Sequence, residues 1–243
     1  MRVHDLLVEQ RRAVADVLAS LPPEHMALPS LCSAWTIHEV AAHLTTYLRL
    51  AQPKIYLGIA LTAGDLDRWN LILTRRAARR DDRALVGDLR RRAGSTCTIP
   101  FSGYDPVLAD VVLHDLDIRR PLGIRRTIPE PALHIAFDHL AQRPVPGYAV
   151  GSRLSGLRLT AHDTGWCHGD GPVVTGSAED LVLAMAGRPA GLAGLSGEGL
   201  PILRTRIRTA TKAPVRERML RVARVIVEPA PLSRRSRRAG LPT

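Results

Sequence analysis

The chain of 243 residues is long enough for one large domain or two small ones, and its 45% hydrophobic and 23% charged residues are typical of a globular protein, which excludes wholesale disorder. No run approaches the 18 consecutive apolar residues of a transmembrane helix, and the charged N-terminal segment argues against a signal peptide. The three cysteines are widely spaced and form no CxxC pattern, which predicts reduced thiols in a cytoplasmic protein.

The net charge of +11 is concentrated near the C-terminus. The segment 201–243 holds twelve basic residues against two glutamates, so it carries +10 and leaves the first 200 residues nearly neutral. Nucleic-acid binding through this tail is one alternative, because arginines can contact phosphates. The nearly neutral body and the 4% of aromatic residues argue against it.

The first part of the chain has the periodicity of amphipathic helices, beginning with residues 5–21. A capping box at Thr36-Ile37-His38-Glu39 predicts the start of a second helix that runs to residue 50. Asp105 and Pro106 suit the first positions of a long helix that Gly123 ends. Further helices are predicted over residues 66–79, 83–93 and 130–142.

The pattern changes after a Pro/Gly-rich linker at 143–152. Alternating residues at 157–163 and the segment VVTG predict two strands, and Ser177 is placed to cap a following helix. Residues 202–227 could form one more amphipathic helix, whereas SRRSRR is expected to be disordered. The predicted organisation is a helical bundle over 1–145, a small α+β domain over 151–205 and a basic tail over 206–243.

Three residues stand out as possible metal ligands. Asp110 and His114 are four residues apart on one predicted helix, so their Cβ atoms lie roughly 5–6 Å apart on the same face. His43 lies in an otherwise apolar stretch of the second helix and must either be satisfied in the core or face a ligand. Such a pair is common, and these residues alone favour a structural role for all three.

Three longer motifs change this interpretation: AWTIHEVAAHL, DVVLHDLDIRRPLG and LRLTAHDTGWCHGDGPVVTGSAEDLVLAMAGR. In this order they resemble the maleylpyruvate isomerase family of mycothiol-dependent enzymes, which is related to DinB-like metal-binding bundles, over residues 5–205. The resemblance implies an α+β protein in which an N-terminal DinB-like four-helix bundle precedes a sterol-carrier-like α+β domain. It also implies a divalent metal, usually zinc, held by His43, Asp110 and His114. Many members have Glu at the middle position, and Asp is one methylene shorter.

The resemblance implies the chemistry as well. Three protein ligands leave an open coordination position, where a bound thiol is deprotonated and becomes the nucleophile. The implied thiol is mycothiol, used by a transferase or an isomerase on a small electrophilic substrate, so no protein nucleophile is needed. Candidate residues for binding the substrate or the thiol are Arg188, Asp117 and Arg76, the last in an arginine-rich segment with Arg75, Arg79 and Arg80.

The remaining candidates have simpler roles. Trp35 is expected to be a packing anchor, Trp166 and His168 lie in a predicted turn, and Cys167 is expected to be a small buried side chain. The main alternative function is a non-catalytic member of the same fold that binds a metal or another ligand. The expected partners are a small-molecule thiol and an electrophile, with no membrane and no nucleic acid.

Overall fold

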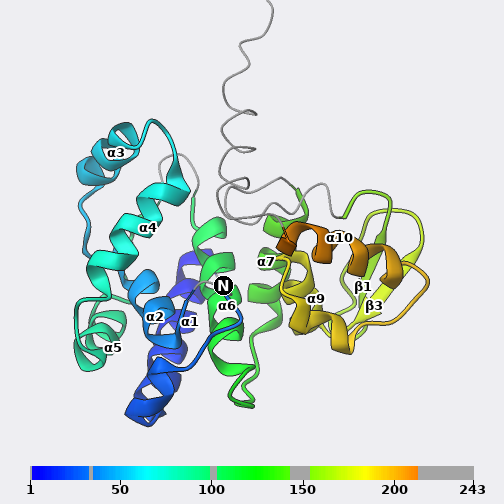
Figure 1. Cartoon of the computed structure of the whole chain (residues 1–243), viewed down its shortest axis with the longest axis horizontal. Coiled ribbons are helices and arrows are strands. Elements are labelled where there is room, and N and C mark those ends of the chain that lie inside the picture. Colours follow the sequence, from blue (N-terminus) through cyan, green and yellow to red (C-terminus); the bar gives the residue numbers. More distant parts are fainter. Residues whose placement is uncertain (1, 33–34, 99–102, 143–153, 213–243) are drawn as a thin grey trace, which may run out of the picture. The chain divides into compact units, whose positions relative to one another are not determined.

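The structure is a computed structural model of the chain, and it describes residues 2–32, 35–98, 103–142 and 154–212 (Figure 1). Helices make up the first part of the chain, with two short 3-10 helices between them. The α-helices are α1 (Val3–Ser20), α2 (Ile37–Thr45), α3 (Gln52–Leu61), α4 (Leu66–Ala77), α5 (Asp82–Arg91), α6 (Asp105–Arg119) and α7 (Glu130–Gln142), and the 3-10 helices are η1 (Pro23–Ala27) and η2 (Tyr47–Arg49).

Four of these helices form a bundle. Helices α1 and α2 each pack against both α5 and α6, while α4 lies against α2 and α7 lies against α6. Helix α2 begins at the predicted capping box, in which Thr36 Oγ1 accepts from Glu39 N–H at 3.2 Å and the Glu39 carboxylate accepts from Thr36 N–H at 2.8 Å. This cap fixes the start of the helix and therefore the face on which His43 lies.

The second part of the chain is a small sheet with helices. Strands β1 (Arg158–Ala161), β2 (Cys167–His168) and β3 (Val173–Gly176) form a sheet of order β2-β1-β3, with β2 antiparallel and β3 parallel to β1. Helix α9 (Ala178–Met185) follows β3 and is capped by Ser177, and η3 (Pro189–Gly194) and α10 (Leu200–Lys212) complete this part. The predicted α+β class is confirmed.

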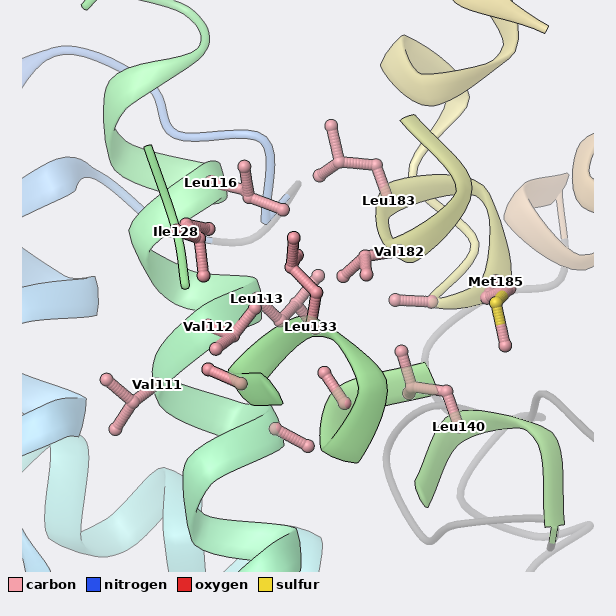
Figure 2. Close-up of a cluster of buried hydrophobic side chains, with 14 of the residues drawn as sticks. Val111, Val112, Leu113, Leu116, Ile128, Leu133, Leu140, Val182, Leu183 and Met185 are labelled. Atoms are coloured by element: carbon pink, nitrogen blue, oxygen red, sulfur yellow. The ribbon is translucent and has the colours of Figure 1, made fainter. Parts of the chain in front are cut away.

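The two parts share one hydrophobic core. Buried side chains of α6, α7 and α9 face one another in a continuous cluster, which Figure 2 shows. Trp166 adds a contact at the sheet, because its ring stacks on Phe137 of α7 with centroids 4.2 Å apart. Residues up to Lys212 consequently form one compact unit. The predicted domain limits at 145 and 151 lie outside the described residues and stay predictions.

Some elements differ from the sequence prediction. Helix α3 was not predicted because it is apolar on all sides and contains Pro53 and Gly58, so it lacks an amphipathic period. Gly58 allows close packing of α3 on α4, since a Cβ there would lie 2.1 Å from Trp69 Cζ2. Asp105 is the first residue of α6 rather than its N-cap, which is Tyr104.

Cys167 was predicted to be buried, but it is exposed because β2 is an edge strand. The predicted helix 202–227 is present as α10 up to residue 212, and its remainder lies outside the described residues together with the linker 143–152 and SRRSRR. Within the described part of the chain, no helix combines the length and apolar character needed to cross a membrane.

Candidate metal centre

The structure brings the three predicted ligands together, although they come from two distant segments. His43 lies on the last turn of α2, and Asp110 and His114 lie one turn apart on α6. One ligand atom from each residue lies within 4.8 Å of the other two. The Asp110 carboxylate sits between the imidazoles, with Oδ2 at 3.4 Å from His43 Nε2 and Oδ1 at 3.4 Å from His114 Nε2.

The distance from each imidazole to its nearer Asp110 oxygen is the one expected between two ligands of a metal ion. Metal–ligand bonds of about 2.0–2.2 Å place neighbouring ligand atoms of a tetrahedron roughly 3.4 Å apart. The shorter side chain of Asp110 therefore reaches far enough to place a carboxylate oxygen 3.4 Å from each imidazole. His43 and His114 are only 8% and 3% exposed, whereas the Asp110 side chain is 28% exposed. The arrangement is thus buried on the histidine side and accessible from the carboxylate side.

The second ring nitrogen of each histidine has its own partner. His114 Nδ1 lies 3.0 Å from Oδ2 of the buried Asp117, and His43 Nδ1 lies 3.2 Å from Oγ1 of the buried Thr74 on α4. Metal-bound histidines almost always donate their other N–H to such an oxygen, which fixes the ring and its tautomer. Both rings are therefore oriented with Nε2 toward the shared centre.

Arg188 reaches this centre from the segment that follows α9. Its Nε and Nη2 donate to Oδ1 and Oδ2 of Asp117 at 2.9 and 2.8 Å, a bidentate pair between residues 71 positions apart. A chain of contacts thus runs from Arg188 through Asp117 to His114. The predicted contact of Arg188 or Asp117 with a substrate stays a prediction. In the structure Asp117 contacts the candidate ligand His114, and Arg188 contacts Asp117.

The charges of the centre stabilise one another. Burial alone would raise the pKa of Asp110, but His114 and His43 beside it hold that pKa well below its usual range. Burial would lower the pKa of His114, but Asp110 and then Asp117 outweigh burial and raise it to about 10. The pKa of Asp117 would likewise be raised by burial, yet Arg188 and His114 lower it. In the absence of a metal ion, His114 is therefore protonated at neutral pH.

Trp35 packs beside both imidazoles, with its ring centroid 4.9 Å from that of His43 and 6.0 Å from that of His114. Trp35 therefore has the expected packing role, and the side chains that it packs against are two of the candidate ligands.

Arg76 is exposed in the last turn of α4, two residues after Thr74. Two residues correspond to about 200° around a helix, so Arg76 projects from the side of α4 opposite His43. Its predicted role in binding stays untested.

Thr74 is the residue that sequence reasoning missed. It lies in an arginine-rich helix, and no local motif marks a threonine as the partner of a histidine 31 residues earlier. Only the packing of α4 on α2 brings the two together.

His168 and Trp166 lie away from the candidate ligands and stack on each other with centroids 5.9 Å apart. Trp166 Nε1 donates to Asp138 at 3.2 Å, so both residues belong to the packing of the sheet on α7.

Fold and site together define a class: a helical bundle with a His–Asp–His centre between two facing helices, followed by a small α+β segment. Residues 7–98 match the family model described as the mycothiol maleylpyruvate isomerase N-terminal domain. Over these residues the chain is similar to that domain family, which agrees with the resemblance seen in the sequence.

Two solved structures are similar to the chain, namely the mycothiol-dependent maleylpyruvate isomerase and a point mutant of it. Each match has 18% sequence identity and a TM-score of 0.50, and it covers 82% of this chain and 95% of the other. At this identity the likeness shows the fold. No curated protein matches the chain.

Proposed function

We propose that the protein is a divalent-metal-dependent enzyme that uses mycothiol to transfer or isomerise a small electrophilic substrate. The observation that carries this proposal is the set of His43 Nε2, Asp110 carboxylate and His114 Nε2, with neighbouring separations of 3.4 Å. The names of the matching domain family and of the similar structures supply the thiol and the class of reaction.

The ligand set favours catalysis over a purely structural role. Three protein ligands leave a fourth position open, which is the pattern of catalytic rather than structural zinc sites. When bound, a divalent cation such as zinc would stabilise the thiolate form of mycothiol at neutral pH and so provide a nucleophile. The partly exposed Asp110 marks the side from which thiol and substrate would approach.

The surrounding residues keep the ligands in the required state. Asp117 accepts a hydrogen bond from Nδ1–H of His114, which keeps the proton on Nδ1 and leaves the lone pair of Nε2 for the metal. Thr74 Oγ1 faces His43 Nδ1 and can do the same for the other ring. Arg188 neutralises the charge of Asp117, so the buried carboxylate stays ionised and able to accept this hydrogen bond. We propose positioning roles for all three residues.

The test combines metal analysis with thiol chemistry. Purified protein should contain about one divalent ion per chain, and His43→Ala and His114→Ala should lose it, whereas a matched change at the exposed His162 should not. Metal-loaded protein should consume mycothiol with members of a panel of electrophiles. Equal metal content in all variants would remove the metal site. Metal-loaded protein that consumes no thiol would instead indicate the non-catalytic alternative.

A further inference from the structure

A second cluster of charges surrounds Asp88 of α5, away from the metal ligands. Asp88 is 1% exposed, and four guanidinium groups surround its carboxylate. Oδ2 lies 2.6 Å from Arg49 Nη1 and 2.7 Å from Arg80 Nη1, and Oδ1 lies 3.0 Å from Arg91 Nη2 and 3.9 Å from Arg92 Nε. These arginines come from η2, from the segment after α4 and from the end of α5, so the fold brings them together around the Asp88 carboxylate.

The cluster holds more positive charge than Asp88 needs. One carboxylate faces four permanently charged guanidinium groups, which leaves a surplus of three positive charges. The arginine side chains are 49%, 27%, 68% and 49% exposed in the order given above, so much of their surface faces solvent. Each guanidinium carries five N–H donors, and Asp88 can satisfy only a few of them. Oriented donors and surplus charge therefore remain accessible.

We propose that this Asp88 cluster is a binding site for a compact oxyanion with two or more negative charges, namely inorganic phosphate or a phosphate monoester. Planar guanidinium groups bind phosphate through paired hydrogen bonds, and the buried carboxylate holds several of them close together. A dianion fits the surplus charge better than a monoanion does. A nucleic-acid backbone fits it less well, because it spreads single charges along a strand, whereas this cluster concentrates its charge around one residue.

Gly87 provides a second observation at the same place. It lies inside α5, where glycine disfavours the helix. A Cβ at this position would lie 2.7 Å from Arg91 Nη1 and 3.2 Å from Arg91 Nη2. The Arg91 guanidinium thus lies across the bare backbone of Gly87 while it donates to Asp88. The glycine makes room for the arginine, which explains a residue that helix stability alone does not favour.

The experiment measures anion binding by calorimetry and by thermal unfolding at constant ionic strength, with inorganic phosphate and glycerol phosphate as probes. The variants are Arg49→Gln and Arg91→Gln, and the control is Arg83→Gln at the exposed start of the same helix. Loss of one charged hydrogen-bond donor should weaken phosphate binding by about tenfold or more. Gly87→Ala should weaken binding while the melting temperature without phosphate stays equal or rises, because alanine favours the helix.

Saturable binding of either phosphate probe, lost in both cluster variants and kept in the control, supports the proposal. Three outcomes would overturn it: equal phosphate binding by all variants, equal stabilisation by acetate at the same ionic strength, or binding of duplex DNA without any binding of the phosphate probes. Gly87→Ala distinguishes a loss of binding from a loss of folding, since it displaces Arg91 without removing a helix-forming residue.

Discussion

The pKa of His114 predicts a competition between a proton and a metal ion. Burial lowers this pKa, but Asp110 and Asp117 raise it to about 10. At pH 7 the metal-free ring therefore holds protons on both nitrogens, facing Asp117 and Asp110. A metal ion needs the lone pair of Nε2, so binding must release one proton. Since a difference of about three pH units corresponds to roughly 4 kcal/mol, affinity at pH 7 should lie about 1000-fold below its limit at high pH.

The direction of the pH dependence follows from this release of one proton on metal binding. Apparent zinc affinity should rise about tenfold per pH unit between pH 6.5 and 8.5, as the proton becomes easier to remove. Competition against a chromophoric chelator at several pH values measures the slope, and calorimetry in two buffers of different ionisation enthalpy counts the released proton. Asp117→Asn removes one cause of the raised pKa, so its affinity should level off at a lower pH. A flat affinity over this range, with no proton released to the buffer, would refute the reasoning.

Four further changes have defined outcomes. Asp110→Ala should weaken metal binding by at least about 10–100-fold, while Asp110→Glu should retain the metal, and chelator competition compares them. Thr74→Val should weaken metal binding roughly 10–100-fold and Thr74→Ser should restore it, which a visible spectrum of cobalt-substituted protein would report. Arg188→Gln should destabilise the protein by about 3 kcal/mol in urea unfolding, because Asp117 stays buried without its bidentate partner. Truncation at residue 230 should change neither metal content nor melting temperature, because the candidate ligands all lie upstream. Loss of metal from the truncated protein would contradict this prediction.

The candidate ligands could be predicted because their signals are local or belong to a family motif. Asp110 and His114 share a face of α6 through their spacing alone. The capping box at Thr36 defines the start of α2 and, with it, the position of His43. The α+β class could be predicted for the same reason, since most helix and strand boundaries have caps or turns in the sequence.

The contacts around the ligands could not be predicted, because they join distant segments. Thr74 meets His43 only through the packing of α4 on α2, and Arg188 meets Asp117 across 71 residues. No spacing of residues along the sequence predicts either contact. Helix α3 was missed for a different reason: an apolar segment without period gives the same pattern for a buried strand, a buried helix or a loop.

The contact of Arg188 with Asp117 has a consequence for biosynthesis. Because a ribosome delivers the chain from its N-terminus, His43, Asp110 and His114 emerge before Arg188. The nascent bundle thus carries all three candidate ligands while the Asp117 carboxylate still lacks its bidentate partner. A segment that emerges after all three candidate ligands therefore supplies the charge that completes the candidate centre, so we expect full metal retention only in chains that extend past Arg188.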